Sequence, residues 1–542
     1  MPRRVAVIAA RSVVVAMVAL SMVVAVGGPA QVPTAHAATG SLACPAGSEW
    51  TLRDLVNSYR QANGRSALPL SAELMAKAQA WSEHMATTGS LTHSNLSSGV
   101  SGGWTYISEN IAYNSSSVAA AQAALQASAP HRANMLSTSS TEMGVGVAQD
   151  ANGWYWVTEV FAGRHTPTPA YVAPSGTSAF DTVTPTVVFN PGRVNGGTTS
   201  TFQVAGVGGV PAGATAAVVT IEAWNPASRG WIQGLGPGAT VASSSNLNLT
   251  SGAAANTAVV PLATNGTMRL YNSMAVNLKV TVTGYFTEVT GCVAAGRFVP
   301  VVPSRILDTR PAYLNGYSGS KPGAGSTVTV QVGGKAGVPA TGVRAVVLNV
   351  TAVMPNGAGD VQAGQYGMAA GAWRNLVVSR PGQVIANLVI VPVDAQGRAA
   401  LRTTVGTHLV VDVEGWFTTS SATPSRSGLF VPVTPARFLD TRYSTGPVQA
   451  VTNVPVAGEH SMPACPRAVL GNLTVIPTQS TTFVQIGPSN QFSGGSYSNI
   501  NNDIVGEPIA NAALVITGQG WDVDTWSWTP TQVIVDIAGW FT

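Results

Sequence analysis

After residue 178 the chain consists of three copies of one sequence pattern, and this repeat limits the available folds more than any other feature. The copies end on closely similar segments, which are LKVTVTGYFT (278–287), HLVVDVEGWFT (408–418) and QVIVDIAGWFT (532–542). The glycine of this segment recurs after 131 residues and then after 124 residues. Such a period is too long for a solenoid unit, and each copy is long enough to fold alone.

Each copy consists of short β-rich runs separated by turns that contain Gly, Pro and Asn. This pattern predicts an all-β sandwich-like or barrel-like module. The copies span residues 179–287, 298–418 and 430–542, with a Ser/Thr-rich linker at 419–429. The first copy is degenerate at its head, where it reads FDTVTPTVVFNPGR (180–193). The heads of the later copies closely match each other and read FVPVVPSRILDTR (298–310) and FVPVTPARFLDTR (430–442).

Charged residues of the heads and tails vary together between the copies. The later copies carry two head arginines and one tail aspartate, which are Arg305, Arg310 and Asp412, and then Arg437, Arg442 and Asp536. The first copy has uncharged residues at these positions, which are Val187, Gly192 and Thr281. An unpaired charge in an apolar strand is costly, whereas a paired charge is tolerated. We therefore expect a head arginine to pair with the tail aspartate within each later copy; solvated edge charges and a ligand site are the alternatives.

The N-terminal segment has the layout of a secretory signal peptide. Three arginines lie within the first eleven residues, an apolar run extends from Val13 to Val26, and the small-residue motif AHA follows at 35–37. We expect residues 1–37 to be removed and the mature protein to be secreted and extracellular. The alternative is a membrane anchor, although the apolar run is short for a span.

The charge of the chain excludes a nucleic-acid binder. The net charge is +4, and loss of residues 1–37 removes three arginines and no acidic residue, which leaves +1. Binding of phosphates needs a clustered basic surface, so we expect no nucleic-acid partner. After the signal peptide no segment is long and apolar enough to predict a transmembrane span.

The three cysteines, Cys44, Cys292 and Cys465, lie in different segments of the chain. An oxidising compartment permits disulfides, but an odd number leaves at least one thiol over. The sequence does not indicate which of them pair. Cys44 follows SLA, as in a lipoprotein cleavage site, but Ser41 stands where that site needs a large aliphatic residue.

The segment at 50–163 is predicted to form helices packed on a small sheet, followed by a Pro/Thr-rich linker at 164–178. Apolar residues recur at helical spacing in two runs, which are Leu52, Leu55, Val56 and Tyr59, and then Leu74, Ala78, Trp81 and Met85. Ser71 is a candidate cap of the second helix, and Gly89 is its stop signal. An alanine-rich helix and two apolar strands follow at 118–127, 143–149 and 154–161.

Three short stretches of this segment carry polar residues against an apolar background, and they are LTHS with His93, SENIAY with Glu109 and SAPHRANML with His131. Two imidazoles and a carboxylate can hold a divalent cation such as Zn²⁺ and leave positions open. They can also exchange protons in acid–base catalysis, or form a structural polar network. No serine in a Gly-x-Ser-x-Gly setting offers a nucleophile.

The same stretches occur in the order seen in the bacterial branch of the CAP superfamily, also called SCP-like after the cysteine-rich secretory proteins. The segments that resemble it are LVNSYRQANGRSALPL, AWSEHMATTGSLTHS, SENIA, SAPHRANML and MGVGVA. The resemblance covers residues 50–163 and implies an α-β-α sandwich with a shallow cleft. Family members often place two histidines and two acidic residues in that cleft, and His93, Glu109 and His131 match three of these four.

The second acid is missing from its usual place on the helix before the second histidine, where this chain has Gln122 and Gln126. Glu142 and Glu159 are nearby in sequence but do not match the motif. This favours a non-enzymatic interaction protein whose cleft binds a small apolar ligand, a cation, a cell-envelope component or a protein partner. The alternatives are a metal-assisted hydrolase of peptide or cell-wall polymer built on the three candidates, and an architectural protein with a vestigial cleft.

The three repeats resemble a β module of secreted proteins from high-GC Gram-positive bacteria, on the basis of their FxPxxPxRxLDTR heads and VDVxGWF-like tails. The resemblance implies an accessory surface role, so we expect adhesion or spacer modules at the cell envelope. Several tryptophans are either core residues, which is the simpler interpretation, or carbohydrate-stacking residues. They are Trp224, Trp373, Trp521, Trp526 and Trp528.

Overall fold

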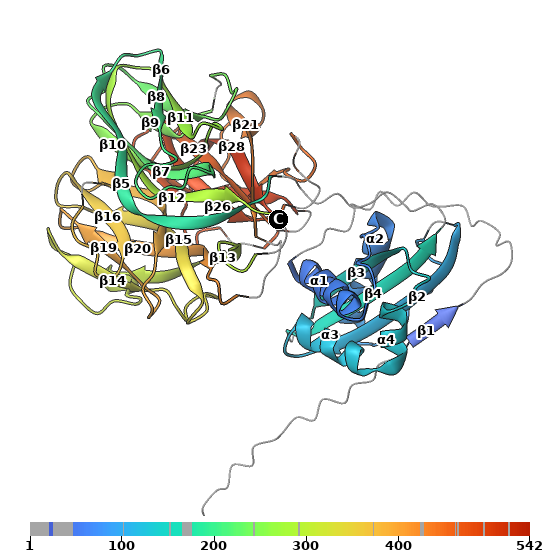
Figure 1. Cartoon of the computed structure of the whole chain (residues 1–542). Helices are drawn as coiled ribbons and strands as arrows, with labels where there is room; N and C mark the ends of the chain where they lie inside the picture. The colour runs from blue at the N-terminus through green and yellow to red at the C-terminus, as the bar shows by residue number, and fades with distance from the viewer. Residues whose placement is uncertain are drawn as a thin grey trace, which may run out of the picture. The chain divides into compact units, whose positions relative to one another are not determined.

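The chain forms two compact units, residues 1–173 and residues 174–542 (Figure 1). The computed structural model describes residues 21–24, 47–100, 102–150, 153–164, 176–241, 244–290, 293–371, 373–422, 428–460, 462, 466–491, 494–518 and 521–542. The three cysteines, the expected cleavage site and much of both expected linkers lie outside these residues, so cleavage stays a prediction.

The first unit is built on one antiparallel sheet with the strand order β1-β2-β4-β3. Its strands are β1 (Ser21–Val24), β2 (Trp104–Asn114), β3 (Glu142–Gln149) and β4 (Tyr155–Arg164). Its helices are α1 (Gly47–Ala62), α2 (Ala72–Thr88), α3 (Val118–Ala127) and α4 (Ala129–Met135). Strand β1 belongs to the expected signal peptide, so cleavage after residue 37 would leave β2 as the edge of the sheet.

Apolar side chains cover both faces of this sheet. One face packs against residues of α1, α3 and α4, which include Leu52, Val56, Ala121, Leu125 and Met135. The other face packs against residues of α2, which include Leu74, Ala78 and Met85. Strand β4 serves both, because Val157 and Phe161 belong to the first cluster and Val160 to the second, as the alternation of side chains along a strand requires. The unit therefore has three layers, helix, sheet and helix (Figure 1).

Helix α2 begins and ends at the residues that the sequence predicts. The Ser71 hydroxyl accepts a hydrogen bond from the Leu74 amide at 3.4 Å, and Gly89 ends the helix with a φ of 64°. The helix lies unusually close to β3, because Gly144 and Gly146 face it. A Cβ atom on Gly144 would lie 2.0 Å from the backbone of Leu74. The glycines of the MGVGVA segment are thus needed for packing of the helix on the sheet.

In the second unit each copy folds into two antiparallel sheets of four strands. The first copy pairs β10-β7-β12-β5 and β6-β11-β8-β9, with bounds β5 (Ser178–Val194), β6 (Thr198–Gln203), β7 (Ala214–Trp224), β8 (Gly230–Leu235), β9 (Leu247–Leu249), β10 (Ala253–Pro261), β11 (Thr267–Asn272) and β12 (Val276–Glu288). The second copy pairs β13-β20-β15-β18 and β14-β19-β16-β17, with bounds β13 (Phe298–Asp308), β14 (Thr327–Gln331), β15 (Val343–Val353), β16 (Gly359–Gln365), β17 (Leu376–Val378), β18 (Val384–Pro392), β19 (Arg398–Thr403) and β20 (His408–Thr418). The third copy pairs β21-β28-β23-β26 and β22-β27-β24-β25, with bounds β21 (Phe430–Asp440), β22 (Thr452–Val454), β23 (Ala468–Pro477), β24 (Thr482–Pro488), β25 (Ile500–Asn502), β26 (Ile509–Ile516), β27 (Val523–Ser527) and β28 (Thr531–Phe541).

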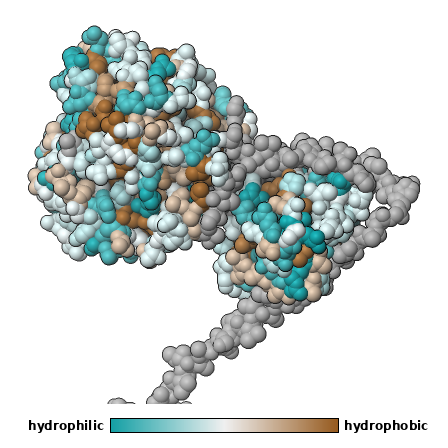
Figure 2. All heavy atoms as spheres, viewed as in Figure 1, coloured by the Kyte–Doolittle hydropathy of each residue, from teal (hydrophilic) through white to brown (hydrophobic). Residues whose placement is uncertain are grey.

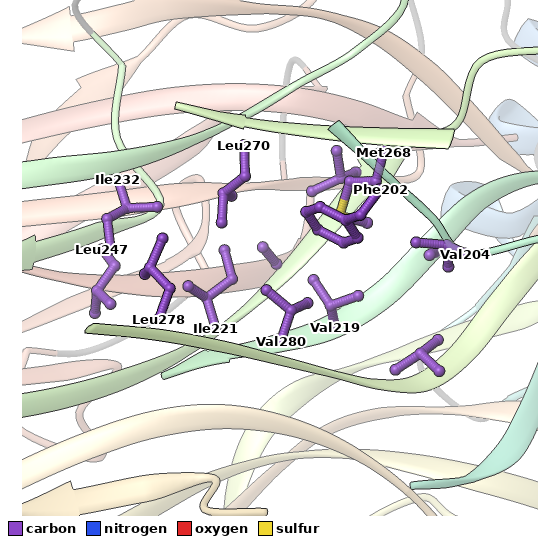
Figure 3. Packing of buried hydrophobic residues seen from close by; sticks show 14 of the residues in the cluster. Phe202, Val204, Val219, Ile221, Ile232, Leu247, Met268, Leu270, Leu278 and Val280 are labelled. Carbon is purple, nitrogen blue, oxygen red and sulfur yellow. The ribbon is translucent and has the colours of Figure 1, made fainter. Parts of the chain in front are cut away.

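Each pair of sheets encloses its own hydrophobic core. Figure 3 shows the core of the first copy, where Phe202 and Met268 come from one sheet and Val219 and Val280 come from the other. Short 3-10 helices follow the heads of the later copies, at Pro311–Tyr313 and Thr441–Tyr443. A single pairing of Ser178 with Phe430 also joins one sheet of the first copy to one sheet of the third.

The three copies share one further core, which we call the central phenylalanine cluster. Each copy contributes one phenylalanine from its head strand and one from its tail strand, and these six residues are Phe180, Phe286, Phe298, Phe417, Phe430 and Phe541. Neighbouring rings lie 4.2–6.4 Å apart between their centroids, and the side chains are at most 2% exposed. An isolated copy would expose these rings to water. The copies therefore form one body, although each is long enough for a module of its own.

Buried asparagines link the three copies in a closed cycle. They occupy the same position in each copy and are Asn256 in β10, Asn387 in β18 and Asn511 in β26. The side-chain amide of Asn387 donates to the Ala255 carbonyl of the first copy at 2.5 Å. The Leu388 amide of the second copy donates to Oδ1 of Asn511 at 2.9 Å. The Ala512 amide of the third copy donates to Oδ1 of Asn256 at 3.2 Å. Because buried amides need partners, this cycle fixes how the copies are aligned.

The face of the protein shown in Figure 2 carries hydrophilic and hydrophobic residues intermixed on both units. Among the helices that the structure describes, none is long and apolar enough to cross a membrane.

Candidate functional site

Glu109 is the centre of a buried hydrogen-bonded group in the first unit. It lies in β2 between Ile107 and Ile111, and its side chain is fully buried. Its Oε1 atom lies 2.8 Å from Nδ1 of His93 and accepts from the Ser94 amide at 2.9 Å. Its Oε2 atom accepts from the Ser94 hydroxyl at 2.6 Å. Both carboxylate oxygens are therefore held by the LTHS segment.

Helix α4 is tied to the same strand through asparagines. The side-chain amide of Asn110 donates to the His131 carbonyl at 3.1 Å, and Asn134 donates to Oδ1 of Asn110 at 2.9 Å. The imidazole of His131 is fully buried. Successive residues of a strand point to opposite faces. Asn110 therefore holds α4 on one face of β2, while Glu109 points to the other.

The structure does not assemble His93, Glu109 and His131 into a metal site. Within the described residues, no three His, Cys, Asp or Glu side chains are grouped so that they could hold a metal ion. The hydrogen bonds give the physical reason, because His93 and Ser94 engage both oxygens of Glu109, and His131 belongs to the helix that Asn110 holds. Binding of a divalent cation, such as Zn²⁺, by these residues therefore stays a prediction.

Glu159 is a buried acid that the sequence did not assign to the site. It lies in β4, and burial raises its pKa to about 7, an effect that hydrogen bonds from Asn110 and Gln122 oppose. Asn110 donates to its Oε2 atom at 2.8 Å. Gln122 stands on α3, where the resemblance led us to look for the second acid, so a carboxyl group reaches that place from a different element. The only signal in the sequence is one glutamate within the apolar segment WVTEVF.

Glu142 has a different role from Glu159. Its Oε1 atom accepts from Nε of Arg164 at 2.7 Å, and both side chains are buried. Arg164 also pairs with Glu73 at the start of α2. This acid therefore joins the end of the sheet to a helix, and it is not part of the group around Glu109.

In the second unit, one head arginine meets the tail aspartate in each later copy. Nε and Nη2 of Arg305 donate to the two oxygens of Asp412 at 3.0 and 3.2 Å. The corresponding atoms of Arg437 donate to Asp536 at 2.9 and 3.2 Å. Burial raises the pKa of both aspartates, and the arginine opposes this in each case. Each pair ties a head strand to a tail strand.

The second head arginine of each copy has another partner. Arg310 pairs with Asp308 at 2.6 Å, and Arg442 pairs with Asp440 at 2.7 Å, so both bind the aspartate of their own LDTR segment. These contacts brace the turn that follows the head strand. The structure thus brings Arg305 and Arg437, and not the second arginines, against the tail aspartates.

The tryptophans considered as carbohydrate-stacking residues differ in exposure. Four of them are partly buried, and they are Trp224, Trp373, Trp521 and Trp526. Trp528 is 57% exposed. Only this last residue presents most of its side chain at the surface.

A comparison with known protein families finds a match within the first unit. Residues 53–161 match the family described as the cysteine-rich secretory protein family, CAP. The matched range contains His93, Glu109 and His131, with the strands and helices that position them. None of the curated proteins compared with the chain matches it.

Proposed function

We propose, from the CAP-family domain that residues 53–161 form, that this protein is a secreted, non-enzymatic binding protein of the bacterial cell envelope. Residues 1–37 act as a signal peptide that is removed on export. The CAP domain takes a small apolar ligand or a protein partner. The three-copy unit attaches the protein to a component of the envelope. CAP-family proteins are typically secreted, which supports the export step.

The closed group around Glu109 is the observation that carries this proposal. A general acid or base has to come within hydrogen-bond distance of its substrate. Glu109 and His131 are both 0% exposed, and the Glu109 oxygens already have partners in His93 and Ser94. These contacts suit residues that hold a loop, a strand and a helix together, and so they favour binding over catalysis.

A hydrolase is the competing function, and Glu159 is the observation that favours it. A carboxyl group with a pKa of about 7 suits proton transfer near neutral pH. Its side chain is nevertheless fully buried and hydrogen-bonded to Asn110, which are the features of a structural acid. We therefore place hydrolysis second.

The second unit is better suited to adhesion than to spacing. A spacer gains length from modules that lie one after another without a common core. Here the central phenylalanine cluster and the asparagine cycle join all three copies into one body. Such a body presents surfaces that lie at fixed positions relative to one another, as a binding module requires.

Sedimentation with isolated cell-wall sacculi tests the proposal. The mature chain and its His93→Ala/His131→Ala variant are incubated with sacculi, with Zn²⁺ or with a chelator, and both bound protein and released fragments are measured. His84→Ala is the matched control, because His84 lies exposed on α2. We expect equal co-sedimentation of all three proteins without release of fragments. Release that depends on the two histidines and stops with chelator would make the protein a hydrolase.

A further inference from the structure

A groove of about 460 Å³ lies where the second and third copies meet. The second copy contributes Gly382 and Val384, and the third contributes Phe483, Asn501, Asp503 and Trp528 among others. We propose that this groove binds a pyranose ring of a glycan, with Trp528 as the stacking surface. The inference rests on the proposed adhesive role of the second unit and deepens it, because it names the site and the class of ligand.

Phe483 and Trp528 line the groove, and together with Trp526, which contacts both rings, they form an aromatic platform. Trp528 stacks on Phe483 with 5.7 Å between ring centroids and 17° between planes. Trp526 supports it from the side at 6.0 Å and 64°. The backbone is also held, since the Trp528 amide donates to the Phe483 carbonyl at 3.1 Å. Trp528 is thus backed on one side and still 57% exposed, so a ligand meets a ring that is already in place.

Polar groups line the groove beside the aromatic platform, and Asn501 is the cross-strand partner of Phe483. Oδ1 of Asn501 accepts from the Ser498 hydroxyl at 3.1 Å, and within the described chain its amide nitrogen makes no hydrogen bond. Asp503 accepts from the Val384 amide at 3.2 Å and pairs with Arg380 at 2.7 Å. The charges at the rim therefore compensate each other, while an amide donor remains for a ligand.

These features together favour a neutral sugar over other ligands. A pyranose ring has one face of C–H groups, which packs on an aromatic ring, and a rim of hydroxyl groups, which needs amide and carboxylate partners. An anionic ligand would need an arginine or lysine that has no acidic partner, and Arg380 is paired with Asp503. A flat ring beside an open amide therefore fits a glycan.

Comparison of the copies shows that the fold does not need the aromatic platform. The strand register places Phe483 and Trp528 where the second copy has Asp360 and Thr404. The second copy forms the same two sheets without these rings. Packing of the module therefore does not account for an exposed tryptophan in the third copy, and a ligand does.

The test is calorimetric titration of the full mature chain with soluble oligosaccharides. The probes are oligomers of β-1,4-linked N-acetylglucosamine, oligomers of α-1,4-linked glucose and glycan strands solubilised from sacculi. We expect one of them to bind, Trp528→Ala to weaken it about tenfold and Trp528→Phe to weaken it less, since a flat ring remains. Tyr443→Ala is the matched control, because Tyr443 is an exposed aromatic residue of the same copy outside the groove.

The outcomes separate this inference from the proposed function. Binding that Trp528→Ala leaves unchanged would overturn the groove as the site. If no probe binds while the wild-type chain still sediments with sacculi, the sugar site is wrong and the adhesive role stands. If the chain neither binds a probe nor sediments, both proposals fall. Loss of probe binding in Trp528→Ala, with binding kept in Tyr443→Ala, supports the inference.

Discussion

Arg305 and Asp412 face each other across β13 and β20 and are joined by two hydrogen bonds of 3.0 and 3.2 Å. In the first copy Val187 and Thr281 face each other at the same place in the sheet. One chain thus contains the charged pair and an uncharged replacement in the same structural setting. This allows the contribution of the pair to stability to be measured against a combination that the fold already accepts.

We predict that Arg305→Val lowers the free energy of unfolding of the second unit by about 3 kcal/mol, because it leaves a buried carboxylate without its partner. Asp412 is only 1% exposed. The double variant Arg305→Val/Asp412→Thr, which copies the first repeat, should recover most of that loss. Urea denaturation measures both. A double variant as unstable as the single one would show that the pair is not the cause.

The central phenylalanine cluster makes a prediction about cooperativity. Phe417→Ala should cost about 3–5 kcal/mol, as truncation of a buried phenylalanine does. Because rings of all three copies touch in this cluster, hydrogen-exchange protection should fall in strands of the first and third copies as well as the second. Loss of protection confined to β13–β20 would contradict a single body and would restore three independent modules.

Local patterns predicted α1, α2, α3, β3 and β4 of the first unit, whereas β1, β2 and α4 were not predicted. The cap at Ser71 and the stop at Gly89 are local signals, and the structure has α2 between them. The ion-pair hypothesis also needed only the comparison of aligned copies, because charges that vanish together point to mutual contact. The first prediction rests on residues close together in the sequence, and the second on residues at the same positions of the aligned copies.

The shared core and the acid at Glu159 were not predicted, for a different physical reason. The period of a strand shows that Phe417 is buried, but not whether it is buried within its own copy or against another one. Likewise Glu159 comes from β4, while Gln122, which it meets, comes from α3. Contacts between distant elements depend on the tertiary packing, and a sequence motif within one helix does not show them.

Glu159 makes the stability of the first unit depend on pH. Its pKa rises from 4.5 to about 7 on folding because burial disfavours the charged form. Between these values the folded state holds a proton that the unfolded state has released, so stability falls as the pH rises. Glu159→Gln should remove this slope and raise stability at pH 8. The measurement is hydrogen-exchange protection of β2 and β4 at pH 5 and pH 8, corrected for the intrinsic rate. If stability falls with pH as steeply in Glu159→Gln as in the wild type, another group is responsible for the pH dependence.

Glu414 makes the stability of the second unit depend on pH in a similar way, over a range that extends to higher pH. It is buried where the second and third copies meet, and its Oε1 atom accepts from Asn499 at 2.7 Å. Burial, and then the nearby carboxylate of Asp412, raise its pKa from 4.5 to about 8. The other copies have Thr283 and Ala538 at the matching position of the tail, so the fold does not require an acid there.

The folded state therefore keeps the Glu414 proton up to about pH 8, whereas an unfolded chain releases it near 4.5. Stability of the second unit should fall through this window as the pH rises. Glu414→Gln should flatten the profile and raise the urea midpoint at pH 8.5, while Glu288→Gln, at an exposed position, should leave it unchanged. If the slope survives in Glu414→Gln, it comes from another acid of the second unit, such as Asp360, Asp412 or Asp536, whose pKa values burial also raises. The contact between the second and third copies would then not depend on pH.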